Sequence, residues 1–112
     1  MGQTKSYIEV SDSDFKKEVL DKSKEVPVVV DFWASWCGPC RVLGPVIEQV
    51  ASENKGKFIL AKMNVEENEM MPSVFGVMSI PNVKMFKNGR VVSEFVGAIP
   101  KASIDKWLKD EL

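Results

Sequence analysis

The segment Val28–Trp33 constrains the fold most strongly, because it reads Val-Val-Val-Asp-Phe-Trp with a single charged residue. An apolar run of this length and composition is typical of a strand buried on both faces of a sheet. A pattern with helical spacing begins at Pro39 and ends just before Gly56, and a second apolar segment, Lys57–Val65, follows it. A strand, a helix and another buried strand in this order predict a right-handed crossover between parallel strands.

The C-terminal part of the chain has the pattern of a β-hairpin. Two segments with alternating apolar and polar residues, Pro81–Lys87 and Arg90–Val96, flank the dipeptide Asn88-Gly89. This dipeptide strongly favours a two-residue turn between antiparallel strands. The hairpin is therefore expected to add an antiparallel half to the sheet. The stretch before it, which contains Pro72, is expected to be irregular.

The remaining segments place helices on both faces of this sheet. Tyr7–Val10 is a short strand candidate, and Ser11–Asp14 offers side chains that cap the start of a helix. A last helix begins at Pro100. Its core-facing residues are expected to be Ile104, Trp107, Leu108 and Leu112. We predict one three-layer α/β/α domain over residues 1–112, with a mixed sheet that is parallel in its first half, and a polar tail at residues 1–6.

Charge and hydropathy argue against several kinds of partner. The 112 residues carry 15 basic and 16 acidic side chains, which gives a formal net charge of −1. Without a basic excess, binding to nucleic acid or to an anionic membrane lacks its main driving force. The chain has neither a membrane-spanning apolar run nor a secretory signal, so a cytoplasmic location is expected. Gly2 and Ser6 match a loose N-myristoylation pattern, which we interpret as part of the polar tail.

The absence of histidine excludes further chemistry. Without it, the chain has neither Ser-His-Asp nor Cys-His catalysis, and no metal site that contains histidine. Its two cysteines, Cys37 and Cys40, supply only half of the ligands that a structural zinc ion needs, so no metal site is expected. A disulfide across so short a loop would stabilise the fold little, since the entropic gain grows with loop length.

The spacing and position of the two cysteines predict a reactive pair. Residues three apart in a first helical turn lie about 5–6 Å apart at Cβ, and a disulfide needs about 3.5–4.5 Å. Small movements therefore interconvert dithiol and disulfide, helped by Gly38 and by Pro39 in the first turn. Free N–H groups and the helix dipole favour the thiolate of Cys37. Cys40 lies one turn further in and is expected to be less exposed. Cys37 is thus the predicted nucleophile and Cys40 the resolving cysteine.

Asp31 is the second informative residue, because it lies inside the apolar strand. Burial of a charged carboxylate is costly, so the pKa of Asp31 is expected to rise. A carboxyl group with a perturbed pKa near a dithiol is a candidate functional group. A structural ion pair between Asp31 and Lys62 is the competing interpretation.

These residues carry a resemblance to a known family. The segment Val28–Pro45, with Asp-Phe-Trp-Ala-Ser-Trp-Cys-Gly-Pro-Cys-Arg at its centre, resembles the thioredoxin family. A Cys-x-x-Cys motif beside a strand–helix–strand pattern is itself a recognised sign of a thioredoxin-like redox site. Further matching segments are Ala61–Val65, Phe75–Pro81, Phe86–Gly89 and Val96–Ala98. The resemblance covers nearly the whole chain from about residue 7 and implies the thioredoxin fold.

The resemblance also implies roles for particular residues. Pro81 would be the family's cis-proline facing the dithiol, and Ile80 would offer its backbone to an extended substrate peptide. Asp31 would act as acid and base for Cys40, with Lys62 modulating it. The apolar substrate surface around Cys37 would be completed by Trp36, Gly76, Val96 and Gly97. Trp33, Gly38 and Pro39 also fall on active-site positions of the family.

The implied activity is the reduction of protein disulfides by dithiol–disulfide exchange, without a bound cofactor. The implied partners are disulfide-containing substrate proteins and a thioredoxin reductase that recycles the disulfide, and the chain is expected to be monomeric. Two alternatives remain open. The same chemistry could run in the direction of a disulfide oxidase or isomerase, or the apolar surface could serve a non-catalytic partner-binding subunit.

Three positions depart from the usual family pattern. Asn82 follows the proposed cis-proline where threonine is usual, Phe75 replaces a common tyrosine, and Ser35 replaces a frequent acidic residue. None of them is part of the dithiol. The departures therefore bear on partner preference and on redox potential rather than on the class of activity.

Overall fold

The computed structural model describes residues 5–112, so the acylation pattern at Gly2 lies outside the described residues. Five strands form one sheet in the order β1-β3-β2-β4-β5. The strands are β1 (Tyr7–Glu9), β2 (Val28–Trp33), β3 (Ile59–Asn64), β4 (Asn82–Lys87) and β5 (Arg90–Val96). β1, β3 and β2 run parallel to one another, whereas β4 is antiparallel to both β2 and β5. The predicted mixed sheet is confirmed.

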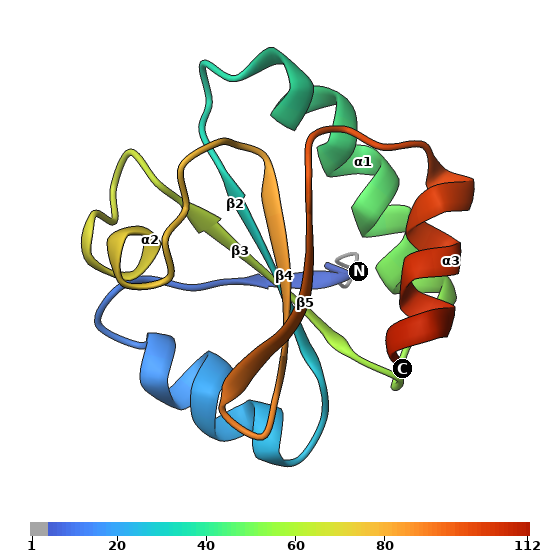
Figure 1. Ribbon diagram of the computed structural model, residues 1–112, viewed down its shortest axis with the longest axis horizontal. Coiled ribbons are helices and arrows are strands. Elements are labelled where there is room, and N and C mark those ends of the chain that lie inside the picture. Colours follow the sequence, from blue (N-terminus) through green and yellow to red (C-terminus); the bar gives the residue numbers. More distant parts are fainter. Residues whose placement is uncertain (1–4) are drawn as a thin grey trace, which may run out of the picture.

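Helices cover both faces of this sheet. The helical elements are η1 (Lys16–Asp21), η2 (Lys22–Lys24), α1 (Gly38–Glu53), α2 (Met70–Val74) and α3 (Lys101–Glu111). Figure 1 shows α1 and α3 together on one side of the strands, and α2 with the N-terminal helical turns on the other. Each side has its own hydrophobic cluster of buried side chains. The three-layer order predicted from the sequence is confirmed.

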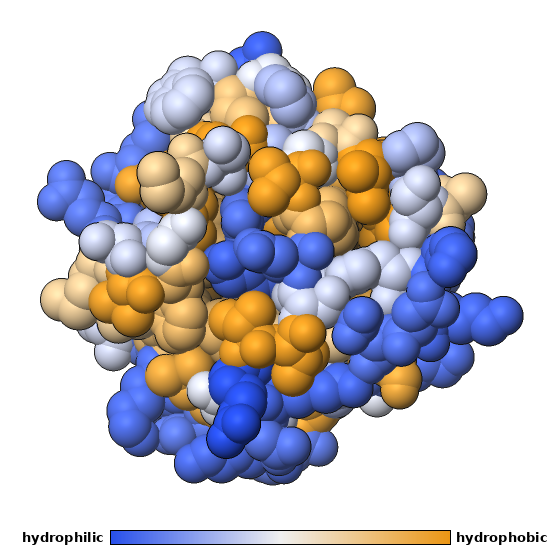
Figure 2. All heavy atoms as spheres, viewed as in Figure 1, coloured by the Kyte–Doolittle hydropathy of each residue, from blue (hydrophilic) through white to orange (hydrophobic). Residues whose placement is uncertain are grey.

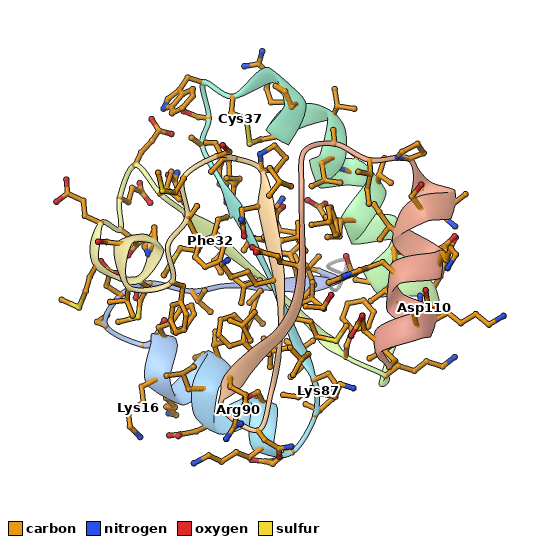
Figure 3. All side chains as sticks on the ribbon, viewed as in Figure 1. Lys16, Phe32, Cys37, Lys87, Arg90 and Asp110 are labelled. Atoms are coloured by element: carbon orange, nitrogen blue, oxygen red, sulfur yellow. A yellow bond between two sulfur atoms is a disulfide. The ribbon has the colours of Figure 1, made fainter. Side chains whose placement is uncertain are left out.

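The central strand β2 has a different core on each face. Val29 packs into the cluster under α1 and α3, while Val28, Val30 and Phe32 pack into the opposite cluster. Figure 3 places Phe32 in the middle of the molecule. Because side chains alternate along a strand, Asp31 lies on the same face as Val29. Its charge is therefore directed into the layer between the sheet and α1.

The predicted cap of the first helix is wrong, because the polar residues before it bind elsewhere. The Asp14 carboxylate accepts from the backbone N–H of Ser11, not from a helical N–H. The Asp12 carboxylate accepts from the N–H groups of Met70 and Met71, at 3.0 and 2.8 Å. It thereby caps α2, which the sequence pattern had indicated as irregular chain, from a position nearly sixty residues away.

The last helix faces the core with fewer residues than predicted. Ile104 and Leu108 are buried, and Trp107 packs at the edge of the same cluster with its indole N–H donating to the Ser93 hydroxyl at 2.8 Å. Leu112 is 44% exposed, so its predicted core position is wrong. The helix ends at Glu111, and Leu112 follows its last turn, with its N–H donating to the Leu108 carbonyl. Within residues 5–112, no helix combines the length and the hydropathy needed to cross a membrane.

The turn between β4 and β5 depends on a glycine. Asn88 and Gly89 both have positive φ, 54° and 80°, and their N–H groups donate to the carbonyl and hydroxyl oxygens of Ser23. We expect Gly89→Ala to lower the free energy of unfolding by about 1–2 kcal/mol, because a Cβ disfavours this conformation. Asn88→Gly, the control, should change it by a few tenths. Urea unfolding measures the stability of both variants. Equal losses would show that the turn does not depend on the backbone conformation of Gly89.

Candidate active site

The two cysteines form a disulfide where β2 leads into α1, with their Cα atoms 5.2 Å apart. Cys37 is the N-cap residue of α1 and has an extended backbone conformation. Figure 3 shows it at the top of the molecule, at the end of α1 that is remote from the hairpin turn. Gly38 and Pro39 form the start of the helix, and Pro39 occupies a position where an N–H would have no helical partner. Strand β2 and the helix start thus place the redox pair together.

The helix terminus provides direct stabilisation of the Cys37 sulfur. Its Sγ accepts a hydrogen bond from the backbone N–H of Cys40 at 3.2 Å. Together with the helix dipole, this bond favours a thiolate at Cys37 after reduction. The expected difference in exposure is absent in the disulfide form, because both cysteines are 5% exposed. The disulfide holds both sulfurs in one small cluster with Ala34, so exposure does not distinguish them.

The loop before β4 lies against the disulfide. The Ile80–Pro81 peptide bond is cis, and the Ile80 carbonyl oxygen is 3.8 Å from the Sγ of Cys37. The Pro81 carbonyl oxygen accepts from the N–H of Gly97 at 2.8 Å, which ties this loop to the end of β5. The structure therefore brings Ile80 and Pro81 to Cys37, and joins Gly97 and the neighbouring Val96 to the same loop.

The surface beside Cys37 carries exposed apolar side chains. Trp36 is 67% exposed, and Val96 is half exposed. Trp33 instead packs against the buried cluster of Cys37 and Cys40. Gly76 lies two residues after the end of α2 with a φ of 66°, and its N–H donates to the Ser73 carbonyl. Figure 2 shows apolar patches above and below a hydrophilic patch at the centre of this view, and a hydrophilic lower rim.

Asp31 is deeply buried beneath α1. It is 1% exposed, and its Oδ1 has no hydrogen-bond partner. Burial, which penalises the charged form, raises the pKa of Asp31 from 3.8 to about 6, and the opposing attraction of Lys62 is weaker. The nearby negative charge of Glu48 adds to the increase. The carboxyl group is thus able to exchange a proton in the mildly acidic to neutral range.

Lys62 is the cross-strand neighbour of Asp31 in β3, yet it binds a different carboxylate. Its ammonium is 2.7 Å from the Oε2 of Glu48 on α1 and lies over the rings of Tyr7 and Trp33. No ion pair between Asp31 and Lys62 occurs in the described structure, so that competing interpretation is wrong. A cleft of about 220 Å³ opens beside this pair. It is lined by Trp33, Cys40, Arg41, Gly44, Pro45, Glu48 and Lys62.

Comparison with known proteins decides the family. A family model described as Thioredoxin matches residues 6–110. The chain belongs to the thioredoxin family. It is 49% identical over 106 residues to the thioredoxin of Chlorobaculum thiosulfatiphilum, covering 95% of this chain and 96% of that protein. It is 46% identical over 104 residues to thioredoxin 1 of Nostoc sp., covering 93% and 95%. With its Cys-x-x-Cys disulfide, this thioredoxin-family chain is a thiol–disulfide oxidoreductase.

Two groups of residues at this thioredoxin-family site were not recognised from the sequence. The first holds the loop before Cys37: the Glu66 carboxylate accepts from both the N–H and the hydroxyl of Ser35, each at 2.7 Å. Arg41 donates to the Ser35 carbonyl at 3.1 Å. These bonds from Ser35 lower the pKa of Glu66. The pairing joins residues 31 positions apart, and no local pattern indicates it.

The second group is centred on Glu48. Cys40, Gly44 and Glu48 follow one another at intervals of four on α1, which places them on one face of the helix. That spacing could have indicated from the sequence that Glu48 lies near Cys40. Gly44 between them leaves room for the Lys62 ammonium, which is 3.5 Å from where a Cβ would be. In residues 5–112, no group of three or more His, Cys, Asp or Glu side chains is arranged to hold a metal ion.

We expect Asp31→Asn to remove a pH dependence of stability. The folded chain holds the Asp31 proton more tightly than the unfolded chain, with a pKa of about 6 against 3.8. Stability from this group is therefore complete below pH ~4 and is lost as pH rises through about 6, by up to about 3 kcal/mol. Urea unfolding of the oxidised protein at pH 4 and pH 8 measures it. An equal loss of stability between pH 4 and pH 8 in the variant would show that Asp31 is not the group responsible.

Proposed function

We propose that this chain reduces disulfides in other proteins and is itself recycled by a thioredoxin reductase. The observation that carries the proposal is the Cys37 Sγ, which lies at the N-terminus of α1, accepts the Cys40 N–H and faces the Ile80 carbonyl. The N–H donor supports an attacking thiolate at Cys37, and the Ile80 backbone lies where an extended substrate peptide would contact it. The chain works as one domain, as a monomer and without a bound cofactor.

In the first step, the Cys37 thiolate attacks one sulfur of a substrate disulfide. A bond forms between Cys37 and that sulfur, the substrate S–S bond breaks, and the other substrate sulfur leaves as a thiolate that takes up a proton. The helix N-terminus favours the thiolate form of Cys37, because its N–H groups and dipole favour negative charge.

In the second step, Cys40 resolves the mixed disulfide. Asp31 accepts the proton of the Cys40 thiol, and the resulting thiolate attacks Cys37. The Cys37–substrate bond breaks, the second substrate sulfur leaves and is protonated, and the Cys37–Cys40 disulfide remains. Two electrons and two protons thereby pass from the dithiol to the substrate. The buried position and the raised pKa of Asp31 support this role, and Lys62 modulates it.

The substrate surface surrounds Cys37. We assign to it Trp36, Gly76, Ile80, Pro81, Val96 and Gly97, with Trp33, Gly38 and Pro39 supporting the dithiol. Support comes from the exposure of Trp36 and Val96 and from the hydrogen bond that links Pro81 to Gly97. Such an apolar surface accepts extended peptides of varied sequence, because apolar contacts are non-directional.

We place the chain in the cytoplasm. A reductant needs a compartment that keeps thiols reduced, and the cytosol provides one. The apolar face beside Cys37 then serves transient contacts with substrates and with the reductase. Light scattering of the reduced protein measures the monomeric state.

The deciding experiment is the reduction of a disulfide-bonded protein with NADPH and thioredoxin reductase, with Cys37→Ser as control. We expect turnover that disappears in the control. Absence of turnover from a chemically competent dithiol would favour a disulfide oxidase or isomerase. A cellular effect that survives replacement of both cysteines by serine would favour a partner-binding subunit.

We expect Cys40→Ser to accumulate a stable mixed disulfide on Cys37. The variant retains the attacking thiolate but lacks the sulfur that breaks the intermediate. Intact-mass spectrometry after mixing with an oxidised protein should show one adduct per chain, which a reductant removes. Cys37→Ser is the matched control, and an adduct on Cys40 in that control, with none in Cys40→Ser, would reverse the assigned roles.

We expect Asp31→Asn to slow the resolving step about tenfold or more, because an amide does not accept the Cys40 proton. In the unchanged protein, the rate should fall as pH drops through about 6, where Asp31 becomes protonated. The variant should lack this inflection. Rapid-mixing measurements of mixed-disulfide decay test it, and an unchanged rate and profile would return Asp31 to a structural role.

A further inference from the structure

Lys62, the cation expected to pair with Asp31, is bound by another carboxylate. Asp31 is the only carboxylate among the buried side chains of the described structure. In the ladder between β2 and β3, its partner is Lys62. The Lys62 ammonium instead lies 2.7 Å from Glu48, and the Oδ1 of Asp31 has no partner. The cation closest in register to the buried carboxyl is thus neutralised by a carboxylate on α1.

β1 places Glu9 beside Lys62 in register, where Glu9 pairs with Lys5. The other strand and helix packed on this face present apolar side chains. β4 presents Val83 opposite Asp31, and α3 presents Ile104 and Leu108 to the same cluster. α1 contributes Cys40 and Glu48 to the cleft that Lys62 also lines. Arg41 of α1 also lines this cleft, but its guanidinium donates to the Ser35 carbonyl. Lys62 and Glu48 are therefore the charged groups that act on Asp31.

Glu48 acts on Asp31 in two ways that have the same sign. Its own negative charge disfavours a second negative charge at Asp31, and its ion pair with Lys62 occupies the cation that would otherwise stabilise it. Both effects raise the affinity of Asp31 for a proton, in agreement with the contribution of Glu48 to its pKa. Gly44 leaves space for this arrangement, since a Cβ there would lie 3.5 Å from the Lys62 Nζ.

We propose that Glu48 is a positioning residue of the dithiol reaction, which holds the Lys62 ammonium on α1 and leaves the buried Asp31 carboxyl without a direct ion-pair partner. A carboxylate with ordinary proton affinity is a weak base toward a thiol, and each tenfold gain in proton affinity makes the transfer from Cys40 correspondingly less unfavourable. This chemical consequence rests on the role proposed for Asp31. The electrostatic arrangement itself does not.

The first measurement tests the arrangement without any reaction. Glu48→Gln removes the charge with little change of shape, and the Glu48 side chain is 33% exposed, so folding is not at risk. NMR titration of the Asp31 carboxyl carbon in the oxidised protein should show a midpoint about one pH unit lower in the variant. An unchanged midpoint would overturn the proposal.

The control is Glu53→Gln. Glu53 lies on the same helix and forms an ion pair of the same kind, with Lys101 at 2.9 Å, but it is outside the cleft of Cys40. It should leave the Asp31 midpoint unchanged. A shift as large as that of Glu48→Gln would show a general effect of helix charge and would also overturn the proposal.

The second measurement follows the resolving step. In Glu48→Gln, the acidic limb of its pH profile should move to lower pH by the same amount as the titration midpoint. In an Asp31→Asn background, Glu48→Gln should have no further effect on the profile. A shifted midpoint with an unmoved profile would overturn the role of Asp31 in the proposed function, and with it the kinetic consequence claimed for Glu48.

Discussion

The structure depends on the position of β2 at the centre of the sheet. It is paired in parallel with β3 and antiparallel with β4, and both of its faces are buried under helices. A strand held on both edges and both faces has no freedom to shift its register, because a one-residue slip would exchange its two cores. The point at which the chain leaves the sheet is therefore fixed, and with it the start of α1 and the position of Cys37.

The same burial has an electrostatic cost at Asp31. Asp31 belongs to the strand that the hydrophobic cores enclose, so its charged form is disfavoured and its pKa is raised to about 6. An alanine or valine at this position would give a more uniform core. The retained carboxyl lowers stability near neutral pH and provides a proton-exchanging group under the dithiol helix. In the proposed reaction, stability and chemistry are therefore opposed at this one residue.

Most of the architecture could be predicted from periodicity, turn residues and length. The crossover, the hairpin at Asn88-Gly89 and the dithiol at a helix start depend on neighbours in the chain. The errors have different causes, and the clearest of them depends on a distant contact. Asp12 caps α2 instead of the helix beside it. Leu112 follows the end of α3 and is exposed. Capping potential is visible in a sequence, but the choice of helix is made in three dimensions.

The sequence by itself determined the fold class, the family and the identity of the reactive pair, because each rests on local pattern or on similarity along the chain. It also indicated Asp31 and Lys62 as candidate partners in an ion pair. Only the tertiary structure decided which carboxylate binds Lys62. Strand register places Asp31 and Lys62 side by side, but the packing of α1 brings Glu48 within 2.7 Å of the ammonium. The partly exposed pair forms there because it needs less desolvation than a pair with the buried Asp31.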